Sequence, residues 1–86
     1  MTSEKVRAAV CSCVAAILKE ERLKRNLSLS ALATRAGLSY QIISYVERRM
    51  RTPNLDTLLR LTDALEIEAA DVLSEARRRV GKSASR

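Results

Sequence analysis

Apolar residues recur at helical spacing in five successive segments of the chain. Spacings of three and four residues place such side chains on one face of a helix. No alternating run of β-branched residues bounded by turn residues predicts a strand. The predicted helices cover about Ser3–Arg25, Leu29–Ala36, Tyr40–Arg48, Leu55–Leu65 and Ala69–Val80. The pattern therefore predicts an all-α, compact five-helix domain whose first helix is extended at its N-terminus.

Short polar residues stand where these helices are expected to begin, and their side-chain oxygens can accept hydrogen bonds from first-turn N–H groups. The candidate N-caps are Thr2 or Ser3, Ser28 or Ser30, Ser39 and Asn54. Gly37 and Gly81 are predicted to end the second and fifth helices in the left-handed C′ conformation. Pro53 cannot continue the third helix, so the preceding residues form a loop.

The 86 residues make one domain. We assign residues 1–81 to it, with an N-terminal extension at 1–13, and residues 82–86 to a flexible polar tail. The apolar stretch Ala8–Leu18 resembles a signal peptide but runs without a break into charged residues and is too short to span a bilayer. We interpret it as part of an amphipathic helix, and expect a cytoplasmic protein with no membrane partner.

Composition narrows the function. The net charge of +6 favours a polyanionic partner. The chain has no His, no Cys pair beyond Cys11 and Cys13 and no pocket-forming Gly loop, so nothing brings a nucleophile and a base together and we expect no catalytic residues. Cys11 and Cys13 would point about 200° apart on a helix and cannot share a metal. They are reduced apolar residues or, alternatively, an intersubunit disulfide or redox sensor. We expect no metal, cofactor or small-molecule ligand.

The second and third helices are joined by a very short turn, so their axes must cross steeply. Ala33 and Ala36 are small where the axes approach, and Gly37 makes the reversal. Leu38, Ile43 and Val46 would lock the third helix onto the second. The residues left on the exposed face, near the amino end of the third helix, can enter a DNA major groove. They are Tyr40, Gln41, Ser44 and Tyr45.

At this point the sequence resembles the phage-repressor type of helix-turn-helix proteins, Cro- and XRE-like. The resemblance rests on Leu32-Ala33, Ala36-Gly37-Leu38-Ser39, Ile43-Ser44, Glu47-Arg48, Pro53-Asn54-Leu55 and the leucines from Leu58 to Leu65, and it covers about Val14–Leu73. It implies a homodimer that binds double-stranded DNA at a partly palindromic operator. Among small members of the family, the chain is similar to restriction–modification controller proteins, plasmid or prophage repressors, and antitoxins.

Carried over by position, the resemblance implies that the four exposed residues of the third helix face base edges. It places phosphate contacts at Ser28, around Ser39, and at Arg48 and Arg51. It also implies a structural ion pair between Arg22 and Glu47.

Two positions depart from the family pattern. Leu29 stands where a phosphate-binding Gln is common, so that contact is lost or supplied elsewhere. Arg49 stands where Gly usually holds a left-handed conformation, at a cost on the order of 1 kcal/mol. A new phosphate contact from Arg49 would offset this cost.

Two surfaces compete for the dimer interface. One lies on the fifth helix, formed by Ala69, Val72, Ala76 and Val80. The other lies on the N-terminal extension, formed by Val6, Val10, Val14 and Cys13. We expect the fifth helix to make the main contact, with the extension packing over it. The sequence thus predicts a transcriptional regulator. The alternative is an antitoxin or protein-interaction module of the same fold that has lost specific DNA binding.

Overall fold

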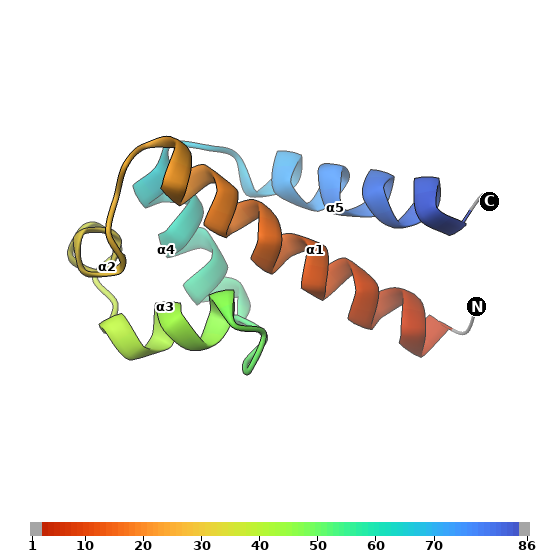
Figure 1. Ribbon diagram of the computed structural model, residues 1–86, viewed down its shortest axis with the longest axis horizontal. Coiled ribbons are helices and arrows are strands. Elements are labelled where there is room, and N and C mark those ends of the chain that lie inside the picture. The colour runs from red at the N-terminus through yellow and green to blue at the C-terminus, as the bar shows by residue number, and fades with distance from the viewer. Residues whose placement is uncertain (1–2, 85–86) are drawn as a thin grey trace.

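The computed structural model describes residues 3–84 of the chain. Figure 1 shows a domain built of helices and loops, and no strand occurs within these residues. The helices are α1 (Ser3–Lys24), α2 (Leu29–Ala36), α3 (Tyr40–Glu47), α4 (Leu55–Leu65) and α5 (Ala69–Ala84). The predicted all-α class, the number of helices and the long first helix are confirmed. The candidate cap Thr2 lies outside the described residues.

The internal helices begin at polar caps that the sequence predicted. The hydroxyl of Ser28 accepts a hydrogen bond from the N–H of Ala31 at 3.0 Å, so Ser28 and not Ser30 caps α2. Ser39 does the same for α3, accepting from Ile42 at 3.2 Å. The side chain of Asn54 accepts from Thr57 at 2.8 Å and begins α4. Local hydrogen bonding therefore sets these boundaries.

The reversal between α2 and α3 depends on Gly37. Its φ of 67° lies in the left-handed region, as predicted. A Cβ added there would lie 3.2 Å from a guanidinium nitrogen of Arg60, so α4 also packs close to the turn. The N–H of Leu38 donates to the carbonyl of Ala33 at 3.0 Å and closes the turn. These contacts fix the direction in which α3 leaves α2.

All five helices contribute to one apolar core. Its most deeply buried members include Leu18 from α1, Leu32 from α2, Ile43 from α3 and Leu65 from α4, each no more than 2% exposed. Val72 and Ala76 on α5 complete it. Because α3 buries only one side in this core, its opposite side is left at the surface.

The long helix α1 lies beside α5, and the two run in opposite directions, so both chain ends lie on the same side of the molecule (Figure 1). This pairing corrects the predicted end of α5. Gly81 is not a C′ residue: it is helical, its φ is not positive, and α5 continues to Ala84. Residues 82–84 of the predicted tail are therefore helical, and the rest of that tail lies outside the described residues.

The same pairing corrects part of the predicted dimer interface. Val72 is 3% exposed and Ala76 is fully buried within a single chain. Both already belong to the core that α1 helps to form. They cannot also form an intermolecular contact, whereas Ala69 and Val80 on the same helix remain partly exposed. No helix within residues 3–84 has the length and apolar character needed to cross a membrane.

Candidate nucleic-acid interface

The surface of α3 combines aromatic, amide and hydroxyl groups. Ile43 and Val46 are 1% and 2% exposed and hold the helix to the core. Tyr40 is 52% exposed and Gln41 is also exposed. Ser44 and Tyr45 reach the surface but are partly buried. The four side chains predicted to read bases thus occupy the side of α3 that the core does not cover, with the first helical turn the most accessible.

A basic loop follows α3 and folds back on its last turn. The N–H of Arg48 donates to the carbonyl of Ser44 at 3.0 Å, and that of Arg49 donates to Val46 at 3.1 Å. Arg49 adopts a φ of 61°, so the left-handed conformation expected at this position is kept without Gly. Arg48, Arg49 and Arg51 are all exposed. The loop therefore holds three cationic side chains at the carboxyl end of α3.

The loop also contacts an aromatic side chain of α3. The guanidinium carbon of Arg51 lies 5.6 Å from the centroid of the Tyr45 ring, within the range of a cation–π contact. The N–H groups of Met50 and Arg51 both donate to the carbonyl of Tyr45, at 2.8 and 3.3 Å. Sequence reasoning assigned Tyr45 and Arg51 to different tasks and missed this contact.

The predicted phosphate contacts at the helix N-termini lie at exposed caps. Ser28 and Ser39 are both exposed at the starts of α2 and α3, where N–H groups favour anions. Their hydroxyls already accept one hydrogen bond each inside the protein. Leu29 packs against the core, and its apolar side chain offers no atom that could bind a phosphate. Any phosphate contact on this side must come from its neighbours.

Beneath the site, α1 is joined to the end of α3 by an ion pair. Arg22 and Glu47, the residues for which the pair was expected, lie 2.7 and 2.9 Å apart at their two N···O contacts. The Arg22 guanidinium also donates to the carbonyl of Leu27 at 2.7 Å. Hydrogen bonding to Glu47 raises the pKa of Arg22 above its ordinary value. This fixed cation joins α3 to α1 and to the α1–α2 connection.

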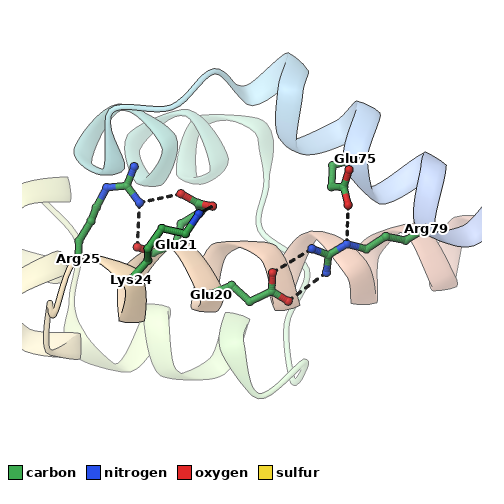
Figure 2. A network of polar contacts seen from close by, with 6 residues as sticks. All are labelled: Glu20, Glu21, Lys24, Arg25, Glu75 and Arg79. Atoms are coloured by element: carbon green, nitrogen blue, oxygen red, sulfur yellow. Dashed lines mark hydrogen bonds and ion pairs between the residues drawn. The ribbon is translucent and has the colours of Figure 1, made fainter.

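Other cationic side chains are engaged in ion pairs away from α3 (Figure 2). Arg79 on α5 bridges Glu20 on α1 and Glu75 on its own helix, with N···O distances of 2.9 Å to each. Arg78 donates to Glu75 as well, at 2.6 Å. Of these arginines only Arg79 joins α5 to α1, whereas Arg78 pairs within α5, and the charges of both are offset by carboxylates.

Ion pairs also surround the carboxyl end of α1, where Glu21 accepts from both Lys24 and Arg25. Cys11 and Cys13 are free and partly buried. Within residues 3–84, no group of three His, Cys, Asp or Glu side chains could hold a metal ion.

A family model described as helix-turn-helix matches residues 18–72. One similar solved structure is the restriction-modification controller protein C.AhdI from Aeromonas hydrophila. It is 32% identical, with a TM-score of 0.68 over 73% of this chain and 94% of that one. Another is the restriction-modification controller protein C.Esp1396I. It is 23% identical, with a TM-score of 0.75 over 85% of this chain and 95% of that one. No curated protein matches the sequence.

Proposed function

This chain belongs to the helix-turn-helix family of DNA-binding proteins, of the Cro- and XRE-like type, and we propose that it regulates transcription as a homodimer on a partly palindromic operator. This is a family of DNA-binding regulators rather than of enzymes. One observation carries the proposal: α3 presents an uncovered polar face directly beside an exposed, arginine-rich loop. That combination suits base reading in a major groove flanked by phosphate contacts.

In the proposed complex, α3 enters the major groove and its exposed residues meet base edges. Gln41 has an amide that can donate to and accept from an adenine in a bidentate contact. Tyr40 and Tyr45 offer rings for thymine methyl groups and hydroxyls for phosphate or base acceptors. Ser44 lies between them on the same side. Since α3 carries no Arg of its own, its reading depends on these uncharged groups.

Phosphate contacts would come from the loop and from the helix N-termini. Arg48, Arg49 and Arg51 are exposed cations, and neutralising phosphates releases counterions, which makes binding salt-dependent. Ser28 and Ser39 bring backbone N–H groups toward the same polyanion. These contacts set the register of the protein on DNA and supply affinity, whereas the α3 side chains supply sequence choice.

For the homodimer we propose an apolar surface on α4 and α5. Leu55 and Leu59 lie one turn apart on α4 and are 68% and 42% exposed, and Leu73 on α5 is 42% exposed. Leu73 lines an apolar hollow with Pro53 and Val10, beside the end of the basic loop. A second copy is the occupant that we infer, because it would cover these leucines and bring two α3 helices onto one DNA. Successive major-groove faces require about 34 Å between them.

The role as a controller of a restriction–modification system is the most specific proposal that we make. C.AhdI, which is itself a controller protein by name, shares 32% of its residues with this chain over almost its whole length.

The experiment is a pair of binding isotherms, measured by fluorescence anisotropy, on the DNA that flanks the protein's own gene and on random DNA. Footprinting of the flanking DNA locates the operator. We expect Gln41→Ala to weaken operator binding by about tenfold or more and random binding little, since one bidentate contact supplies about 1–3 kcal/mol of discrimination. Equal losses on both DNAs would remove Gln41 from base reading.

Arg48→Ala tests the phosphate contacts in the same assay. It should weaken binding to both DNAs and lower the salt slope by about one. The matched control is Arg78→Ala, which removes an exposed arginine on α5, away from α3. If footprinting finds no operator and binding to all DNA is weak and independent of salt, the protein is an interaction module and not a regulator.

A further inference from the structure

We propose that Arg51 positions the Tyr45 ring for base reading while the edge of its guanidinium contacts a phosphate. The inference rests on the proposed DNA-binding function and deepens it. It assigns specificity to a loop residue whose charge alone would suggest only affinity.

Arg51 is connected to Tyr45 twice, once through the backbone and once through its side chain. Its N–H donates to the carbonyl of Tyr45 at 3.3 Å, and the N–H of Met50 donates to the same carbonyl at 2.8 Å. Its guanidinium carbon lies 5.6 Å from the centroid of the Tyr45 ring. The backbone hydrogen bonds hold the loop at a fixed distance from α3, so the side chain of Arg51 extends toward the ring from a fixed backbone position.

The backbone conformation of Arg49, two residues before Arg51, stiffens this arrangement. Arg49 has a φ of 61°, which reverses the chain so that Arg51 returns toward α3. The loop then ends at Pro53, whose ring fixes its own φ and restricts Thr52 to an extended backbone conformation. Arg51 is therefore presented to Tyr45 by the course of the backbone and not by a long, freely rotating segment.

An arginine in a cation–π contact keeps its hydrogen-bonding capacity. The N–H donors of a guanidinium lie in its plane, so the face can contact a ring while the edge points elsewhere. Arg60, Arg78 and Arg79 use their edges to bind carboxylates. No carboxylate partner of Arg51 occurs within residues 3–84, and the residue is exposed. Its edge is thus open toward a phosphate.

The two tyrosines of α3 differ in the freedom of their rings. Tyr40 is more than half exposed and has no cation–π contact with any arginine or lysine of residues 3–84, whereas Tyr45 is partly buried and carries the Arg51 contact. Ordering Tyr45 before DNA arrives would lower the entropic cost of binding. A phosphate that engages Arg51 would then also fix the ring at the neighbouring base. Phosphate contact and base reading are coupled through this pair.

The test uses Arg51→Lys, which keeps the charge but replaces the planar group by a compact, strongly hydrated ammonium. The quantity measured is the specificity ratio, operator affinity divided by affinity for random DNA. We expect this ratio to fall by about two- to fivefold, the size of an exposed cation–π contact, with the salt slope unchanged. In a Tyr45→Leu background, Arg51→Lys should leave the ratio unaltered, because the ring that Arg51 positions is gone.

A second measurement needs no DNA. In the free protein, NMR should show the side-chain protons of Arg51 shifted upfield by the Tyr45 ring, and the shift should vanish in Tyr45→Leu and persist in Tyr45→Phe. An unchanged specificity ratio in Arg51→Lys, an equal fall in the Tyr45→Leu background, or no ring shift would each overturn the inference while the regulator function stands. A wild-type protein that binds all DNA equally would instead overturn the proposed function, and the inference with it.

Discussion

Arg22 and Glu47 are 25 residues apart in sequence and form a bidentate ion pair, with N···O distances of 2.7 and 2.9 Å. Their side chains are only 10% and 7% exposed. The pair joins the carboxyl end of α1 to the last residue of α3. A third hydrogen bond, to the carbonyl of Leu27, ties in the α1–α2 connection. The ion pair therefore holds α3 from the side that faces the rest of the protein, away from its exposed face.

Breaking one half of this pair should destabilise the fold strongly. Glu47→Gln leaves the Arg22 charge buried without its counter-charge, which costs about 3–5 kcal/mol when a buried pair is broken. Urea unfolding followed by circular dichroism measures the change. The double variant Arg22→Met with Glu47→Leu is the control, because it removes both charges and should recover much of the lost stability. A loss below about 1 kcal/mol in Glu47→Gln would mean that solvent screens the pair as it does at a surface.

Replacing Arg49 by Gly should separate stability from DNA binding. A non-Gly residue in the left-handed region costs about 1–2 kcal/mol, a cost that Gly avoids. Gly in turn loses roughly 0.5–1 kcal/mol more backbone entropy on folding, which offsets part of the gain. Arg49→Gly should thus stabilise the protein by about 0.5–1 kcal/mol and weaken binding to random DNA through the lost cation.

Glu66→Gly is the matched control for that variant. Glu66 has a φ of 59°, like the 61° of Arg49, but it caps α4 away from the basic loop. It should give a similar gain in the free energy of unfolding and no loss of DNA affinity. Equal DNA affinities of wild type and Arg49→Gly would exclude Arg49 from the phosphate contacts.

Helix boundaries followed from the sequence wherever a local hydrogen bond or a backbone conformation decides them. Ser39 and Asn54 cap their helices because a short side chain reaches the first-turn N–H groups whatever the tertiary context. Gly37 adopts its left-handed conformation for an equally local reason. At Gly81 the same rule failed. There α5 continues beside α1, and packing between distant segments outweighs the low helix propensity of one Gly.

What each helix face contacts was harder to predict from the sequence than where the helices begin and end. An apolar stripe shows that a helix face is covered but not by what, so Val72 and Ala76 were assigned to a partner chain when α1 covers them. The contact between Tyr45 and Arg51 depends on the path of the loop, which no spacing rule encodes. In contrast, the pair of Arg22 and Glu47 came from resemblance to a family, in which the positions of the two residues already carry long-range information.

Acid should weaken the ion pairs that Glu75 makes along α5 at a defined pH. Hydrogen bonds from Arg78, and then from Arg79, lower the pKa of Glu75 from its ordinary value of 4.5 to about 2. Since the folded-state pKa is the lower one, the contribution to stability is complete above the unfolded pKa and is lost as the pH falls from 4.5 toward 2. Wild type should lose Tm more steeply than Glu75→Gln over this range.

High salt should shrink the difference in acid dependence of Tm between wild type and Glu75→Gln, because the ion pairs of Glu75 lie at the surface and are screened. The control for Glu75→Gln is Asp63→Asn, which removes an exposed carboxylate on α4 that forms no ion pair within residues 3–84. Its Tm should fall with acid as steeply as that of wild type. Parallel curves for wild type and Glu75→Gln would show that the ion pairs of Glu75 contribute nothing in solution.

The proposed dimer surface predicts which leucine holds two chains together. Leu73→Glu places a charge at a site that lines the apolar hollow beside the basic loop, and burying a charge without a partner is strongly unfavourable. Sedimentation equilibrium should show the dimer weakened by at least about tenfold, since burial of a leucine supplies about 1.5–3 kcal/mol. Leu59→Glu on α4 should act in the same direction.

Leu23→Glu is the matched control, because Leu23 is also a large exposed apolar residue, 54% exposed, but lies on α1. It should leave the dimer intact. Operator affinity should fall in Leu73→Glu, because one α3 helix engages only a half-site, whereas the circular dichroism spectrum and the pair of Arg22 and Glu47 should stay unchanged. If Leu23→Glu separates the chains and Leu73→Glu does not, the interface lies at the carboxyl end of α1 and not on α4 and α5.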